Sequence, residues 1–413
     1  MTLFASVDAF WVGTRLGSDG LAAVSTSLFW IWMMVALAEM IGVGLTAVAA
    51  RRHGEGRPLI AAGIAGDALL FTLAIGILVT VVGLLALRGL FATMQTPAAV
   101  TALGVRYLGA YLVGIPLIYG FFAIDATFRA AGDTRTPFIL LATSVAVTLV
   151  LDPALILGWG PLPRLGIAGA AIATVATRGV AFAMGVMLAT RRKLLRVRRP
   201  QMESIAAVCR VGLPTAVTGV VFSIIYIAVT RTATRFGTPA LAALGIGHRV
   251  ESWLFMIGVG CGAATAAIVG QNLGAGEVKR AERAGWLAVG LCSALGLVAC
   301  IADLLFAPTL AHLFTNDPAV IVEAARYLRI AAISQLLICC EIVLEGALGG
   351  AGETLPPMIA SSSFTAARVP IVPFAADRWG SVGIWWTISL TAIGRALSMI
   401  ALWRWGRWKT RSL

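Results

Sequence analysis

The sequence predicts an all-α polytopic membrane protein made of two parallel six-helix repeats. Three observations lead to this fold class. The chain of 413 residues is 59% hydrophobic and only 12% charged, whereas a soluble protein carries roughly a quarter of charged residues. Apolar runs long enough to cross a bilayer as helices recur along the whole chain. Short motifs also recur at one constant spacing, which indicates an internal duplication.

Six apolar runs in each half are the expected membrane spans, because a bilayer core of about 30 Å needs about 20 helical residues. In the first half these runs are residues 1–13, 21–50, 58–87, 103–128, 136–158 and 166–190. In the second half they are residues 205–231, 241–270, 284–306, 325–348, 356–376 and 382–403.

The duplication has an offset of 220 residues. It pairs Gly17 with Gly237, Gly54 with Gly274, RYL (106–108) with RYL (326–328), and AGDTRTP (131–137) with AGETLPP (351–357). Equivalent loops should face the same side, so each half crosses the membrane an even number of times. The halves are then parallel repeats related by an axis along the membrane normal. We predict an N-terminal six-helix domain (1–190), a basic linker (191–203) and a C-terminal six-helix domain (204–413).

The formal net charge of +13 does not indicate nucleic-acid binding, because zinc-finger spacings and a soluble basic domain are both missing. Basic clusters such as 191–200 and the tail 403–413 flank apolar runs, which is typical of cytoplasmic loops. The C-terminus is therefore expected in the cytoplasm. The six cysteines form no C-x-x-C pair and the three histidines are scattered. These patterns predict no metal site, and no catalytic motif indicates an enzyme.

Two carboxylates of the first half are expected at one level inside the predicted spans. Asp8 and Asp152 are each expected about 10 Å below the outer face at a rise of 1.5 Å per residue. An acid at this depth costs several kcal/mol unless it is neutral, paired or hydrated, and a second nearby carboxylate disfavours charge further. The pair is expected to share a proton or a cation. Alternatively, both are structural groups. The repeat favours a coupling site, because Ala228 and Val372 stand at the equivalent positions.

Several segments together resemble the multidrug and toxin extrusion (MATE) family over nearly the whole chain. They are VDAFWVGTRLGSDGLAAV, AARRHGEG, FRAAGDTRTP, VLDPALILGWG, GIAGAAIATV, VGLPTAV and GIGHRVES with VGQNLGAGE. GIGHRVES and VLDP look most like the damage-inducible (DinF-like) branch. The resemblance implies twelve helices in two six-helix lobes, and efflux of organic, often cationic, compounds against entry of H⁺ or Na⁺. We expect a monomeric multi-pass protein of the inner membrane, in contact with lipid, with no cofactor beyond the coupling ion.

The resemblance assigns Asp8 and Asp152 to the cation site of the first half. Thr148 lies one turn before Asp152 and shares its helix face, but many relatives carry Asn there, which weakens the expectation of Na⁺. Thr174 and Tyr107 match polar positions near the family's site, with packing or interfacial anchoring as the alternative. The family's first helix begins earlier, so we expect either an upstream start or half of a first helix.

In the second half, Glu251 resembles an acid of the damage-inducible branch and could attract a cationic substrate, with a structural hydrogen bond as the alternative. Glu341 is a further substrate-binding candidate, because Phe121 stands at its repeat position. Asp125 and Glu345 are repeat partners, which favours a structural role for both.

Two other functions are weighed against an antiporter. A lipid-linked oligosaccharide flippase has a related topology, but it would line its cavity with many Arg and Lys for pyrophosphate. A membrane enzyme would need a catalytic constellation at one depth, and the sequence offers only the acid pair. The sequence leaves the substrate and the choice between H⁺ and Na⁺ open.

Overall fold

The computed structural model of the chain describes residues 2–94, 96–159 and 163–411. Within the first helix, the side chains of residues 2–10, 13–18, 21 and 29 lie outside the description. The described residues form thirteen α-helices and one short 3-10 helix, and they contain no strand. The prediction of an all-α protein is therefore confirmed.

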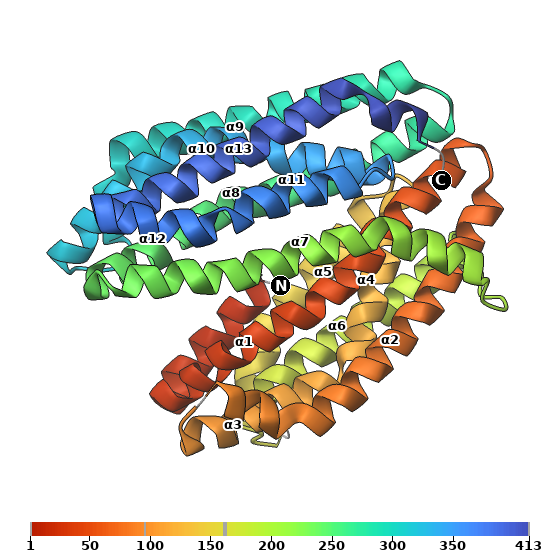
Figure 1. The fold of residues 1–413 in the computed structure, drawn as a ribbon. Coiled ribbons are helices and arrows are strands. Elements are labelled where there is room, and N and C mark those ends of the chain that lie inside the picture. Colours follow the sequence, from red (N-terminus) through yellow and green to blue (C-terminus); the bar gives the residue numbers. More distant parts are fainter. Residues whose placement is uncertain (1, 95, 160–162, 412–413) are drawn as a thin grey trace. The chain divides into compact units, whose positions relative to one another are not determined.

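The first six helices contain all the spans predicted for the first half. They are α1 (Thr2–Gly54), α2 (Pro58–Thr93), α3 (Ala98–Val113), α4 (Ile115–Ala130), α5 (Arg135–Leu157) and α6 (Ile167–Arg191). The predicted runs 1–13 and 21–50 both fall in α1, whose 53 residues would measure about 80 Å as a straight helix. In Figure 1 the first, deepest red part of α1 turns back beside the part that follows it.

The remaining helices contain the spans predicted for the second half. They are α7 (Met202–Thr234), α8 (Gly237–Gly274), α9 (Val278–His312), α10 (Pro318–Gly350), α11 (Leu355–Ala366), α12 (Arg368–Trp379), α13 (Ser381–Trp405) and the 3-10 helix η1 (Arg407–Thr410). Figure 1 draws them from green to blue. Within the described residues, nine helices are long and apolar enough to cross a membrane, or ten if α3 and α4 are one span.

Two spans predicted as continuous are broken. The run 103–128 divides into α3 and α4, which are bent by 49° at Gly114, just before Pro116. The run 356–376 divides into α11 and α12 at Ala367. The repeats therefore break at positions that the offset of 220 residues does not relate.

The chain divides into two compact units, residues 1–45 with 57–209 and residues 46–56 with 210–413. We call them the first unit and the second unit. The basic linker packs on the first unit. The Arg196 backbone N–H donates to the Ala62 carbonyl at 3.0 Å, and the Arg198 guanidinium lies 3.1 Å from the buried Asp67 carboxylate.

In the first unit, α6 packs against α3, α4 and α5, and α2 packs against α3 and α4. The buried core combines apolar residues with tyrosines of α3 and α4. The Tyr119 hydroxyl of α4 donates to the Met34 carbonyl of α1, which ties these two helices together.

In the second unit, α10 is central and packs against α8, α9 and α13. It begins at the helix cap Asp317, whose carboxylate accepts the Ala319 N–H at 2.9 Å, as is typical of helix N-termini. Its close approach to α8 depends on two glycines, because a Cβ at Gly346 would collide with the backbone of Gly262. Small residues allow such close helix contacts in membranes.

Candidate functional site

Asp152 lies in α5, and its side chain is fully buried, with 0% exposure. Pro153 follows it inside the helix. Because proline has no backbone N–H, the carbonyl of Leu149 loses its helical donor. α5 ends at Gly158, which adopts a left-handed conformation with φ of 76°. The carboxyl group is thus held in the last turns of a buried helix, close to a carbonyl oxygen that is free of its helical bond.

Contacts between α5 and α6 fix the register of these two helices, which the short stretch 158–166 connects. The hydroxyls of Thr148 on α5 and Thr177 on α6 lie 2.7 Å apart. Nearer the connection, a Cβ at Gly169 of α6 would lie 2.7 Å from the Leu155 backbone of α5. The helices therefore run antiparallel in close contact on both sides of residue 152.

This register places Asp152 opposite the stretch 172–174 of α6. Asp152 and Thr174 therefore lie at one level on facing helices, and Thr174 is 2% exposed. Thr148 is one turn further along α5 and also buried, with 0% exposure. The structure thus brings three of the predicted site residues into one buried region of the first unit.

Thr177 belongs to this region and was missed by the sequence reasoning. It is buried, bonds to Thr148, and donates to the Ala173 carbonyl at 2.9 Å. Thr148 similarly reaches the Ser144 carbonyl at 2.9 Å. The sequence could have indicated Thr177, because it lies three residues after Thr174 and shares its helix face.

The side chain of Asp8 lies outside the described residues. Its backbone is part of α1, and Val12, one turn later, is buried in the same core cluster as Ile156, one turn after Asp152. Tyr107 of α3 belongs to that cluster and is 1% exposed. One core cluster of the first unit therefore includes residues one turn from each of the two predicted acids.

Glu251 occupies a separate polar cluster in the second unit. The Tyr327 hydroxyl donates to its carboxylate at 2.9 Å, and His248 Nδ1 lies 3.7 Å from the other carboxylate oxygen. The ring of Tyr226 is 4.9 Å from the His248 ring. Glu251 thus lies among aromatic side chains from α7, α8 and α10.

Asp303 of α9 is a second acid of this region that the sequence reasoning did not single out. It is 2% exposed and is an electrostatic neighbour of Glu251. The sequence already marks Asp303 as a candidate, because it is an ionisable residue inside the predicted span 284–306.

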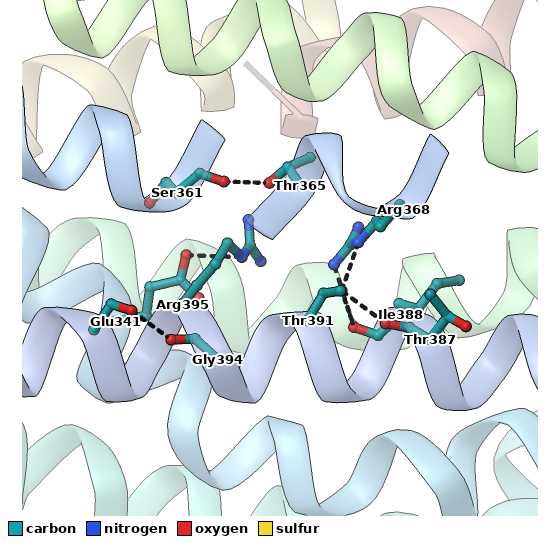
Figure 2. A network of polar contacts seen from close by, with 10 residues as sticks. Glu341, Ser361, Thr365, Arg368, Thr387, Ile388, Thr391, Gly394 and Arg395 are labelled. Atoms are coloured by element: carbon teal, nitrogen blue, oxygen red, sulfur yellow. Dashed lines mark hydrogen bonds and ion pairs between the residues drawn. The ribbon is translucent and has the colours of Figure 1, made fainter. Parts of the chain in front are cut away.

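Glu341 lies in another buried network of the second unit, shown in Figure 2. It is 5% exposed, and Arg395 Nε of α13 lies 3.3 Å from its carboxylate. Arg368 Nε donates to the Thr391 hydroxyl at 2.7 Å, and its Nη2 donates to the Ile388 carbonyl at 3.2 Å. The two predicted substrate-binding acids therefore lie in different clusters.

Metal ligation is not indicated in the part of the chain that the structure describes. It contains no group of three or more His, Cys, Asp or Glu side chains arranged to hold a metal ion. The chemistry that these clusters can perform is the uptake of a proton or of a cation by carboxylates held at membrane depth.

Comparison with known proteins identifies one family. The MatE family model matches residues 1–154 and 214–374. The two matches end 220 residues apart, which is the offset of the internal repeat.

Similar proteins cover nearly all of the chain. "Probable multidrug resistance protein YpnP" of Bacillus subtilis is 27% identical over an alignment of 420 residues that covers 99% of this chain and 92% of the relative. "Probable multidrug resistance protein NorM" of Deinococcus radiodurans is 31% identical over an alignment of 362 residues that covers 84% of this chain and 78% of the relative. The crystal structure of the Vibrio cholerae MATE transporter VcmN in the bent form superimposes with a TM-score of 0.89 at 22% identity, over 99% of this chain and 94% of that one. This likeness confirms the predicted fold class.

Proposed function

Because the chain belongs to the MATE family of multi-pass membrane transporters, which are not enzymes, we propose that it is a proton-coupled antiporter exporting organic, cationic or amphiphilic compounds. We place it in the inner membrane, as a monomer with a cytoplasmic C-terminus. The segment GIGHRVES leads us to assign it to the damage-inducible branch.

The observation that carries this proposal is the fully buried carboxyl group of Asp152 at the level of Thr174. An ionised carboxylate at membrane depth is costly unless a cation or a proton joins it. Asp152 is therefore suited to take up a positive charge from one side of the membrane and to release it on the other.

In the proposed cycle, a proton from outside is shared by Asp8 and Asp152. Neutralising this pair removes its repulsion and allows the first helix to rearrange, so that the substrate is released outward. The units then return to the inward-open state. The gradient can drive export, because it supplies about 2.3 kcal/mol per charge per 100 mV and about 1.4 kcal/mol per pH unit.

The threonine hydroxyls favour a proton over a sodium ion. Thr148 and Thr177 bond to each other and to helix carbonyls, so these hydroxyls are satisfied without a metal ion. A sodium ion needs several oxygen ligands, whereas a proton needs one carboxylate oxygen. We therefore assign Thr148, Thr174 and Tyr107 to positioning around the acid pair.

We assign the substrate's positive charge to Glu251. The rings of Tyr226 and Tyr327 lie near this acid, and aromatic faces attract organic cations. Glu341 is less suited to this role, because Arg395 already lies beside its carboxylate. A pyrophosphate-bearing lipid is a poor fit, since only Arg178 and Arg368 among the arginines of the described residues are buried.

The test is transport by the purified protein in sealed vesicles. An imposed pH gradient should drive ethidium accumulation by the wild type, and Asp8→Asn and Asp152→Asn should each abolish it. Asp19→Asn is the matched control, because Asp19 is an exposed acid of α1. Ethidium transport by Asp152→Asn at the wild-type rate would contradict the proposal, and transport driven by a sodium gradient at equal pH would refute the choice of ion.

A further inference from the structure

Equivalent positions of the two repeats differ in side-chain charge around one pair of acids. The offset of 220 residues pairs Asp125 of α4 with Glu345 of α10. It also pairs Phe121 with Glu341. The two repeats therefore allow one buried position to be compared in two electrostatic settings.

In the first unit, two arginines lie near Asp125. Arg129 Nη1 lies 2.6 Å from the Asp125 carboxylate, and Arg178 is a second electrostatic neighbour. The Arg178 guanidinium lies over the ring of Phe121, 5.7 Å from its centroid. Glu39 of α1 is also within electrostatic range of Arg129, so two carboxylates and two guanidinium groups balance in this cluster.

In the second unit, the acidic and basic side chains do not balance. Gly349 stands in the position of Arg129 and supplies no charge, and Glu341 replaces Phe121. Arg395 matches Arg178 after the three-residue shift that the repeat shows in this region, and it lies 3.3 Å from Glu341. Two carboxylates thus share one arginine. Among the described residues, Glu345 forms no ion pair of its own, although Glu341 and Arg395 are its electrostatic neighbours.

Three buried polar atoms indicate that the cluster can accept a further ligand. In the described part of the chain, one carboxylate oxygen of Glu341, the hydroxyl of Ser361 and Arg395 Nε are buried without a hydrogen-bond partner. Ser361 is 1% exposed. Figure 2 shows Ser361 of α11, Glu341 and Arg395 at the same end of the network. Buried polar groups normally have partners, so this space suits a small polar species.

Other charged groups do not supply a second positive charge to pair with Glu345. Arg368 of α12 is in electrostatic range of Glu341, but its guanidinium hydrogen-bonds to groups of α13. Arg368 also faces Glu251 of α8, which in turn faces Asp303 of α9. Arg368 is therefore shared between Glu341 and the acid of α8.

We propose that Glu345 binds a proton beside the Glu341–Arg395 ion pair, so that the second unit contains a proton site of its own. A carboxyl group in this place has no counter-charge of its own, because Arg395 is already paired with Glu341, and its neutral form is favoured at membrane depth. The role in transport rests on the proposed function: if protons drive export, Glu345 adds a second protonated carboxyl group to the cycle.

Infrared difference spectroscopy of the purified protein tests the site without transport. The carbonyl band of protonated carboxylic acids is compared between about pH 5 and about pH 9, a range that spans neutral pH and lies above the ordinary carboxyl pKa. Glu345→Gln should remove one component of this band. Glu341→Gln should retain it but shift its titration to lower pH, because Arg395 is then free to pair with Glu345. Asp125→Asn, the repeat partner, should leave the component unchanged.

A spectrum of Glu345→Gln identical to that of the wild type would overturn the proposal, as would loss of the same component in Asp125→Asn. All variants are compared as monodisperse protein. If Glu345→Gln does not fold, Glu345→Asp replaces it: the carbonyl component should then shift in frequency, and an unshifted component would overturn the proposal. The experiments distinguish failure of the proposed antiport function from failure of the proposed Glu345 site. A Glu345 band without pH-driven ethidium transport would refute only the antiport function, whereas transport without that band would refute only the site.

Discussion

The guanidinium of Arg192, just beyond the end of α6, lies 2.5 Å from the carboxylate of Asp133 in the loop between α4 and α5. Thr136 strengthens this contact, since its hydroxyl donates to Asp133 at 2.5 Å and its backbone N–H at 3.0 Å. The last helix of the first repeat is thereby fastened to a loop of the same unit.

The second repeat has an equivalent arrangement. Glu353 is the repeat partner of Asp133, and its carboxylate lies 3.8 Å from Arg407 Nε and 3.6 Å from Arg411 Nε. Both arginines follow α13, the last helix of that repeat. In each repeat, the acid of the AGDT or AGET motif (Asp133 or Glu353) thus pairs with arginines that follow the last helix of that repeat, α6 or α13.

Replacing Asp133 by Asn should lower stability in a pH-dependent way. Partial burial raises the pKa of Asp133, but the hydrogen bonds from Thr136 and the ion pair with Arg192 outweigh it and hold the pKa below the ordinary value of 3.8. A group with a depressed pKa stabilises the fold above its unfolded pKa and loses that contribution as pH falls through its folded pKa.

Thermal unfolding in detergent should therefore show a Tm about 2 °C lower for Asp133→Asn than for the wild type near neutral pH. The difference should vanish as the pH falls below the ordinary aspartate pKa. A gap that grows on acidification would contradict this assignment.

Trp408 should anchor the C-terminal segment. It is fully buried, with 0% exposure, and stacks on Trp403 at 4.0 Å between ring centroids, and Lys409 beside it lies 2.8 Å from Glu282. We expect Trp408→Ala to cost about 3 kcal/mol or more and to expose the tail to trypsin. Trp405→Ala is the matched control, because Trp405 is 71% exposed. Equal trypsin sensitivity of the two variants would rule out this anchoring.

The sequence alone located the helices well, because membrane spans must be long and apolar and their limits fall at loops. It did not locate the breaks at Gly114 and Ala367. Hydropathy continues across both positions, and a break in a buried helix depends on which neighbours can satisfy the freed backbone groups. The repeat offset could not predict either break from the other, since the two breaks are not at equivalent positions.

The candidate sites were predicted only in part. An acid in an apolar run is visible in the sequence, so Asp152, Glu251 and Glu341 could be singled out. Their partners come from other helices, and the register that joins Thr148 to Thr177 is set by packing between α5 and α6. The contact between Glu341 and Arg395 likewise requires the three-dimensional arrangement of α10 and α13.

Gly346 should be essential for the contact between α8 and α10. A Cβ at this position would meet the backbone of Gly262, which cannot move aside without separating the helices. We expect Gly346→Ala to destabilise the protein by about 1–3 kcal/mol, as overpacking does. Gly260→Ala is the control, because no atom lies within 4 Å of its added Cβ. Unfolding midpoints measured in the same detergent should separate the two variants, and equal midpoints would count against the close contact.

Glu251→Gln should weaken transport of cationic substrates selectively. Removing its charge leaves the hydrogen bond from Tyr327 possible but deletes the attraction for a positive group, so the KM for ethidium should rise about tenfold, which corresponds to about 1.4 kcal/mol. The KM for a neutral amphiphile should change little. Glu323→Gln is the control, because Glu323 bonds to Trp385 at 2.8 Å and to Arg326 at 3.0 Å. Its loss should lower the Tm while leaving the ratio of the two KM values unchanged. If Glu251→Gln raised both KM values equally, the acid would serve the structure of the second unit, and the positive charge of the substrate would have to be bound elsewhere.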